Sequence, residues 1–228
     1  RVIMTDPKVM NYFYEESVKT LRTNIQFAGR DVKSIVVTSC FPNEGKSDVA
    51  FQLAREIGNI GKRVLYLDAD IRKSSIASRY QVRQTVKGLS QYLCGQASAE
   101  EILYHTNYEN MDIIFAGRLA PNPAELLEEE AFRELLLEKR KEYDYLLVDT
   151  PPVANLSDAA IVSKLCDGVV LVIESGLVRY KVAQKVVEQI GRSGCRILGA
   201  VLNKVDTDKL KSYGSRYDYY YYYYGSRK

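Results

Sequence analysis

The tripeptide Gly45-Lys46-Ser47 lies between an apolar run and a segment whose apolar side chains have helical spacing. The run Ser34–Ser39 predicts a buried strand, and residues 45–57 predict a helix. Backbone N–H groups at such a loop and helix start point toward phosphate oxygens, and the helix dipole adds a partial positive charge there. Lys46, which we expect to be exposed at the loop rather than packed, would then reach the β- and γ-phosphates of a nucleotide, and the Ser47 hydroxyl would hold Mg²⁺.

The loop departs from the general phosphate-binding pattern at one place, because Cys40 stands where G-x-x-x-x-G-K-[ST] has its first glycine. A chance Gly-Lys-Ser at an ordinary helix N-terminus is the alternative interpretation. Asp48 adds a negative charge near the phosphates, which the N-terminus of a helix tolerates. The residues expected to contact the nucleotide are Pro42, Asn43, Glu44, Gly45, Lys46, Ser47, Asp48 and Asn203.

Acidic residues stand at the ends of two other apolar runs. Asp149 follows residues 145–148 and opens Asp-Thr-Pro-Pro, while Asp68 ends the run 63–68 and Asp70 comes two residues later. Residues i and i+2 of an extended chain point to the same face, so Asp68 and Asp70 are expected to face the nucleotide together. Two close carboxylates repel, and a metal ion or a proton-accepting role would justify them. The alternatives are solvated loop aspartates or a strand-end cap. The predicted metal ligands are Ser47, Asp68, Asp70 and Asp149.

The tetrapeptide Asn203-Lys204-Val205-Asp206 has the form N-K-x-D, which recognises guanine in GTPases, and it follows a predicted strand. Four residues with one free position recur by chance in many proteins. Asn203 alone could equally contact the edge of an adenine. A GTPase switch therefore stays open as an alternative on these residues.

All these polar residues lie at the ends of short apolar runs that alternate with helical segments. Such alternation implies a mostly parallel sheet covered by helices on both faces. We expect a doubly wound α/β P-loop fold over residues 31–206, with a helical extension over residues 1–30 and a disordered tyrosine-rich tail over residues 207–228. The expected strands are residues 34–39, 63–68, 111–115, 145–149, 169–173 and 196–203, and the expected helices are residues 14–27, 45–57, 130–141 and 181–192.

The composition is that of a soluble globular protein of 228 residues, with 46% apolar and 27% charged side chains. A net charge of +3 does not argue for a nucleic-acid binder. Apolar runs are far shorter than the roughly 20 residues of a membrane helix. The four cysteines are widely spaced, so neither a zinc site nor a disulfide framework is indicated, and we expect free thiols in a reducing cytoplasm.

Tyrosine is the unusual residue, with 18 in the chain and eight in the last 16 positions. The final segment has Leu210 as its single aliphatic side chain from residue 207 onward, so it cannot bury a core of its own. Six consecutive tyrosines also follow neither the helix nor the strand period. The predicted phosphate acceptors are Tyr213, Tyr217, Tyr219, Tyr220, Tyr221, Tyr222, Tyr223 and Tyr224.

Taken together, the sequence resembles the bacterial tyrosine kinases that control capsule and exopolysaccharide synthesis. Residues 39–47 resemble their modified Walker A motif, residues 64–72 their Walker A′ motif, and residues 146–152 their Walker B motif. Residues 88–95 and 116–127 resemble further family segments, and the tyrosine cluster resembles the autophosphorylated tail. The resemblance implies ATP-dependent transfer of phosphate to tyrosine with Mg²⁺. It also makes Asp68 the preferred acceptor of the tyrosine proton, although the residues themselves do not separate Asp68 from Asp70.

Cell-division and plasmid-partition ATPases share an ancestry with these kinases, but they differ from this chain at one position of the phosphate loop. They carry a signature Lys four residues before the loop glycine, where this chain has Phe41, and they lack a tyrosine tail. A partition-type ATPase is therefore the less favoured enzyme. A non-catalytic regulator that binds nucleotide to change its oligomeric state is the alternative from another class.

The charged residues Glu16, Lys19 and Arg22 match the oligomerisation motif E-x-x-R-x-x-R of that family, with Lys in the middle position. Spacing of three residues places them on one stripe of a helix. The resemblance implies a homo-oligomeric ring, an octamer by analogy, and the alternative is a solvated helix face. It further implies a membrane adaptor, fused upstream or separate, a cytoplasmic location at the inner face of the membrane, and other protein-tyrosine substrates but no nucleic acid.

Overall fold

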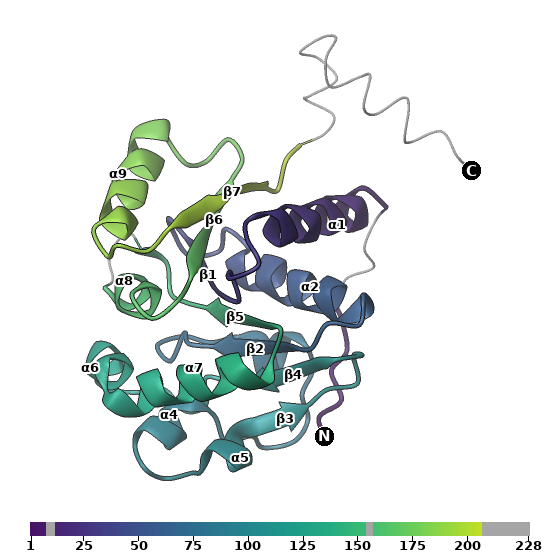
Figure 1. Cartoon of the computed structure of the whole chain (residues 1–228), viewed down its shortest axis with the longest axis vertical. Coiled ribbons are helices and arrows are strands. Elements are labelled where there is room, and N and C mark those ends of the chain that lie inside the picture. The colour runs from purple at the N-terminus through teal and green to yellow at the C-terminus, as the bar shows by residue number, and fades with distance from the viewer. Residues whose placement is uncertain (8–11, 154–156, 207–228) are drawn as a thin grey trace.

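The fold is a seven-stranded sheet with helices on both faces, seen in a computed structural model that describes residues 1–7, 12–153 and 157–206 (Figure 1). Within these residues the strand order is β3-β4-β2-β5-β1-β6-β7. Only β3 runs antiparallel to its neighbour, and the other pairs are parallel. The strands are β1 Ser34–Ser39, β2 Val64–Asp68, β3 Leu103–His105, β4 Met111–Ile114, β5 Tyr145–Asp149, β6 Gly168–Glu174 and β7 Ile197–Asn203.

The helices form two layers, one on each face of the sheet. Apolar side chains of α1, α2 and α3 pack on one face, and those of α4 to α9 pack on the other. The predicted doubly wound, mostly parallel architecture is therefore confirmed. The helices are α1 Tyr12–Phe27, α2 Lys46–Asn59, α3 Ile76–Arg79, α4 Leu89–Leu93, α5 Ala99–Ile102, α6 Pro123–Glu128, α7 Glu130–Glu142, α8 Asp158–Ser163 and α9 Tyr180–Gly191.

The central strands are buried on both faces, as their unbroken apolar character predicts. All six residues of β1 and all five of β2 are buried. Alternate side chains enter opposite cores, so Leu65 and Leu67 face the α7 side while Tyr66 faces the α2 side. This two-sided burial fixes the positions of the strand ends, from which the polar residues project.

The boundaries of the expected elements agree with the structure within a few residues, but the strand β3 and the short helices α3, α4, α5, α6 and α8 were not expected. β3 has three residues that are half-buried or exposed, and it pairs antiparallel with β4 at the edge of the sheet. Such a short edge strand carries no apolar run in the sequence. None of the helices in the described part of the chain combines the length and the apolar character needed to cross a membrane.

Candidate active site

The predicted loop and acidic residues come together at the carboxyl ends of the central strands. The loop joins β1 to α2, and its Lys46 is the first residue of that helix. β5 lies between β1 and β2, and Asp68 and Asp149 are register partners at the ends of β2 and β5. The parallel sheet therefore gathers three separate sequence segments at the carboxyl ends of its strands, which is where open α/β sheets bind ligands.

Lys46 lies among carboxylates rather than in solvent. Its Nζ is 3.5 Å from Asp70 Oδ2, 3.5 Å from Asp149 Oδ1 and 3.1 Å from Ser47 Oγ. Only 12% of the side chain is exposed, so the expectation of an exposed loop lysine was wrong. Burial alone would lower the pKa of Lys46, but the nearby carboxylates, Asp149 first, raise it above its ordinary value. A permanent cation is thus held where phosphate charge would arrive.

Asp68 is fully buried, and both of its carboxylate oxygens accept hydrogen bonds from its own loop. The Asp70 backbone N–H donates to Oδ1 at 3.1 Å, and the Ser74 hydroxyl donates to Oδ2. Burial, followed by the charge of Asp149, raises the pKa of Asp68 to about 8. A carboxylate with a raised pKa binds a proton more readily than a solvated one, which suits a proton acceptor.

Asp149 presents its two oxygens to different surroundings. The Tyr66 hydroxyl donates to Oδ2 at 2.9 Å. The other oxygen, Oδ1, is buried and accepts no hydrogen bond from a described residue, with Lys46 Nζ at 3.5 Å as its nearest ion-pair partner. Burial raises the pKa of Asp149, which the attraction of Lys46 and the nearby hydroxyls of Ser47 and Tyr66 oppose. Tyr66 was not identified from the sequence, where it reads as an ordinary strand residue.

The donor set fits a Mg²⁺ ion bound together with phosphates. Across the described ranges, no three histidine, cysteine or acidic side chains are placed to hold a metal ion by themselves. Mg²⁺ in nucleotide sites takes one or two protein oxygens and completes its shell with phosphates and water. The unpartnered oxygen of Asp149 and the hydroxyl of Ser47 are such oxygens, whereas Asp68 and Asp70 are held by neighbouring groups.

The backbone conformation of the loop accounts for the residue types at two of its positions. Gly45 has φ +89°, a backbone conformation that favours glycine, and a Cβ there would lie 2.3 Å from Asn203 Nδ2, which would have to move. Asn43 has φ 67°, in the region that asparagine tolerates better than most residues. The Glu44 side chain is buried and accepts a hydrogen bond from the Cys40 N–H at 3.1 Å, so it braces the loop from inside.

Residues of the N-K-x-D segment hold the phosphate loop from the end of β7, two strands away from β1 in the sheet. Asn203 Nδ2 donates to the Glu44 carbonyl at 2.9 Å, and Lys204 Nζ donates to the Asn43 carbonyl at 2.6 Å. Lys204 also pairs with Glu174 at 2.8 Å. The sequence suggested base recognition for Asn203, and the structure adds a loop-supporting role that the spacing alone does not reveal.

Two clefts open on either side of the loop, and Gly45 lines both. The phosphate cleft, of about 460 Å³, holds Lys46, Ser47 and the three aspartates, with Pro42 and Asn43 at the loop. The apolar cleft, of about 430 Å³, lies between α1, the start of α2 and the end of β7. Its walls include Phe13, Val18, Val49 and Val201, together with Asn203.

Two ion pairs near the phosphate cleft were not expected. Asp48 accepts a hydrogen bond from Arg79 at 2.5 Å, so the charge that seemed out of place near phosphates is balanced. Arg72 forms a two-pronged contact with the fully buried Asp158, at 2.6 and 3.0 Å. Arg72 ends the segment 64–72 that resembles the Walker A′ motif, but its partner lies 86 residues away and carries no local signal.

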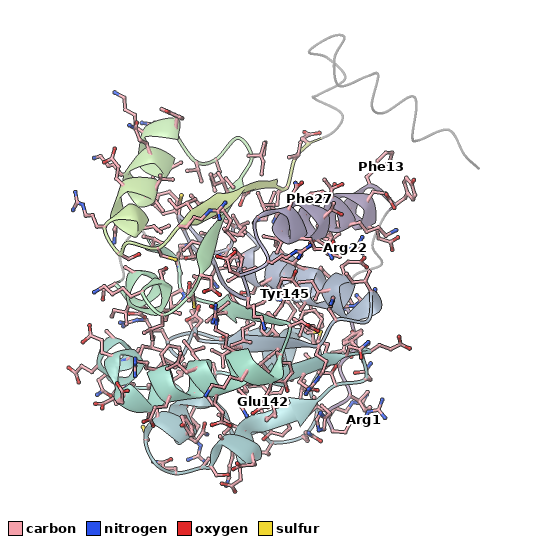
Figure 2. The ribbon with its side chains drawn as sticks, in the orientation of Figure 1. Arg1, Phe13, Arg22, Phe27, Glu142 and Tyr145 are labelled. Atoms are coloured by element: carbon pink, nitrogen blue, oxygen red, sulfur yellow. The ribbon has the colours of Figure 1, made fainter. Side chains whose placement is uncertain are left out.

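The three residues of the proposed oligomerisation stripe are divided between two environments. Glu16 and Lys19 form a half-exposed pair at 2.8 Å. Arg22 lies between α1 and α2, where it contacts Glu56 at 3.4 Å (Figure 2). Its Nε is buried without a hydrogen-bond partner among the described residues. The eight predicted phosphate-acceptor tyrosines lie outside the described residues.

Comparisons with known proteins agree with this architecture. The "AAA domain" family model matches residues 32–194. The chain is 36% identical over 205 residues to the tyrosine-protein kinase CpsD of Streptococcus agalactiae, covering 90% of this chain and 89% of that protein. It is 38% identical over 215 residues to the tyrosine-protein kinase YwqD of Bacillus subtilis, covering 93% and 89%.

Solved structures give the same result at two levels of similarity. The kinase domain of the Escherichia coli tyrosine kinase ETK matches with a TM-score of 0.80 and 34% identity, over 84% of this chain and 75% of that one. The septum site-determining protein MinD of Pyrococcus horikoshii, complexed with Mg-ADP, matches with a TM-score of 0.67 and 23% identity, over 77% and 72%, which shows a shared fold alone. The kinase matches cover most of the chain and are much closer in sequence, so the chain belongs to the family of bacterial tyrosine-protein kinases.

Proposed function

We propose that this domain transfers the γ-phosphoryl group of ATP to tyrosine, chiefly to the tails of neighbouring copies, and thereby regulates capsule or exopolysaccharide synthesis and export. The observation that carries the proposal is the meeting of Lys46 with Asp68, Asp70 and Asp149 beside a phosphate loop. The activity follows from the family, and the pathway follows from the resemblance of the motifs and the tyrosine-rich tail.

Each part of the site has a role in this proposal. Loop amides and Lys46 hold the phosphates, and the nucleoside extends toward the apolar cleft and Asn203. Ser47 and Asp149 hold Mg²⁺, which when bound neutralises charge that develops on the β- and γ-phosphates. The acceptor tyrosine enters the phosphate cleft, where its hydroxyl takes the place of the Ser74 hydroxyl on Asp68. Since phenol has a pKa near 10, its placement matters more than the strength of the base.

The tail supplies the first test. An extended residue spans at most about 3.3–3.6 Å, so roughly 20 residues reach a neighbouring active site, and tethering gives an effective concentration near the millimolar range. Protein made in a host without other tyrosine kinases should carry phosphate on residues 213–224, by mass spectrometry. Deleting residues 207–228 should remove most autophosphorylation while leaving nucleotide binding unchanged. Equal phosphorylation of the shortened chain would contradict the assignment of the tail as substrate.

The second test concerns the oligomer, and Glu56 of α2 supplies its control. Replacing Glu16 and Arg22 together by Ala should convert a wild-type oligomer to monomer in light scattering, because a closed ring repeats one interface. Arg22 also contacts Glu56 within the chain, so Glu56→Gln serves as a control that loses only the internal pair. A size distribution that is unchanged in the double variant, or equally changed in Glu56→Gln, would count against the interface.

Phosphorylation is expected to loosen this oligomer. Each phosphate adds about −1.5 to −2 charges, so several would make neighbouring tails repel.

We further propose that a membrane adaptor, fused upstream or separate, binds the domain at the cytoplasmic face of the membrane and raises its activity. Other proteins with accessible tyrosines are the remaining substrates in this proposal.

A further inference from the structure

A buried hydroxyl lies directly beneath the proposed metal site. Tyr66 is fully buried in the middle of β2, on the sheet face covered by α2, and its register partner on β5 is the apolar Leu147. Its hydroxyl crosses to the end of β5 and donates to Asp149 Oδ2 at 2.9 Å. A phenylalanine would fill nearly the same volume, so the bond to Asp149 is the specific contribution of the tyrosine.

The Tyr66 ring is fixed by aromatic packing. The Phe51 ring meets it edge-on, with centroids 5.7 Å apart and planes at 66°. Tyr80 stacks on Phe51, with ring centroids 3.8 Å apart and planes at 28°. Phe51 belongs to α2, the helix that begins with Lys46, so the hydroxyl is held in register with the phosphate loop.

This bond gives the two oxygens of Asp149 separate tasks. A carboxyl group turns easily about its last side-chain torsion, for which the energy wells are broad. With Oδ2 held by Tyr66, Oδ1 is left buried without a hydrogen bond, 3.5 Å from Lys46 Nζ. Proteins orient a ligating carboxylate by donating a hydrogen bond to the oxygen that does not bind the metal, and such bonds maintain the affinity of the site for the metal.

We infer that Tyr66 is a positioning residue for the proposed Mg²⁺ site, because its hydroxyl fixes Asp149 with one oxygen turned toward the ion. The inference rests on the proposed function, since it assumes that Asp149 holds Mg²⁺ with the nucleotide. Tyr66 itself touches neither the ion nor the phosphates. Its removal should therefore change how tightly Mg²⁺ binds, and change the chemical step little once the site is filled.

The test is a Mg²⁺ titration of Tyr66→Phe at saturating ADP, in which the thermal unfolding midpoint is measured at each Mg²⁺ concentration. A ligand that binds only the folded state raises that midpoint according to its affinity. The apparent dissociation constant for Mg²⁺ should rise about tenfold, the usual effect of losing an outer-shell partner. In kinase assays the KM for Mg²⁺ should rise similarly, and kcat at saturating Mg²⁺ should approach the wild-type value.

Tyr143→Phe is the matched control. The Tyr143 hydroxyl donates to Asp112 Oδ2 at 2.6 Å. Asp112 lies near the amino end of β4, so this bond is at the amino ends of the parallel strands, whereas the loop is at their carboxyl ends. Both variants lose one phenol–carboxylate hydrogen bond, and both should unfold at lower temperature. Only Tyr66→Phe should need more Mg²⁺.

Three outcomes would overturn the inference in different ways. If both Tyr→Phe variants show the wild-type Mg²⁺ dependence, Tyr66 is merely part of the core. If wild-type protein gains no stability from ADP with Mg²⁺, the proposed metal-nucleotide site itself fails. If Tyr66→Phe does not fold, Phe51→Leu takes its place in the test, because it retains the hydroxyl but loosens its ring. The apparent dissociation constant for Mg²⁺ should then rise by less than the tenfold expected of Tyr66→Phe, and an unchanged affinity would reject the role of a fixed hydroxyl.

Discussion

Replacing Lys46 by Met should lower tyrosine phosphorylation by about 10²- to 10³-fold or more, the loss expected when one preorganised electrostatic group is removed. Lys46 is the cation that lies closest to both Asp70 and Asp149 at the loop, each at 3.5 Å. Without it, phosphate charge would enter a site dominated by buried carboxylates. The measurement is incorporation of radioactive phosphate from labelled ATP, alongside circular dichroism to show that the variant is folded.

Lys62→Met is a suitable control for this substitution. Lys62 is half-exposed and lies 3.9 Å from Asp144, so it loses an ion pair of little energetic value. Lys46→Met should also lower the free energy of unfolding at neutral pH more than Lys62→Met does, because it leaves buried carboxylates without their cation. A folded Lys46→Met protein with the wild-type rate would separate the kinase activity from this loop.

Asp68→Asn should produce the other large loss, about 10²- to 10⁴-fold in the phosphoryl-transfer rate, the range for removing a general base. Affinity for Mg²⁺ and nucleotide should change little, since both Asp68 oxygens are occupied by Ser74 and by the Asp70 N–H. Asp70→Asn should instead weaken nucleotide binding, because Asp70 pairs with Lys46. Single-turnover rates and ADP titrations of the two variants decide between them, and the reverse pattern would make Asp70 the base.

The raised pKa of Asp68 also predicts how the free energy of unfolding of the ligand-free protein depends on pH. Burial raises its pKa to about 8, from an ordinary value near 4. Between these two values the folded state holds more protons than the unfolded state, so the free energy of unfolding falls as pH rises through this window. In Asp68→Asn that decline between about pH 4 and 8 should be shallower in urea unfolding experiments. An identical slope would show that Asp68 titrates normally.

The sequence predicted the parts of this protein that depend on local pattern. β1, β2 and β5 carry continuous apolar runs, and the polar residues that follow them identify the loop and the acidic strand ends. Because parallel strands align their carboxyl ends, the meeting of Lys46 with Asp149 could be expected from the sequence.

Other features depend on contacts between distant segments and left no local trace. Tyr66 looks like any strand residue until β5 brings Asp149 beside it. Arg72 finds Asp158 only through packing of α8, and Arg22 turns toward Glu56 because α1 packs on α2. The edge strand β3 is too short and too exposed to give a period. Lys46 seemed exposed because the sequence shows its charge but not the three carboxylates around it.

The most direct measurement of the central claim is transfer of phosphate between copies of the chain. The Lys46→Met chain serves as an inactive acceptor with an intact tail, and a chain lacking residues 207–228 serves as a donor with an intact site. After the two are mixed with Mg²⁺ and ATP, mass spectrometry should find phosphotyrosine within residues 213–224 of the Lys46→Met chain, and none when either chain is incubated alone. Absence of phosphotyrosine in the mixture, with a donor that still binds ATP and forms mixed oligomers with the acceptor, would contradict the account.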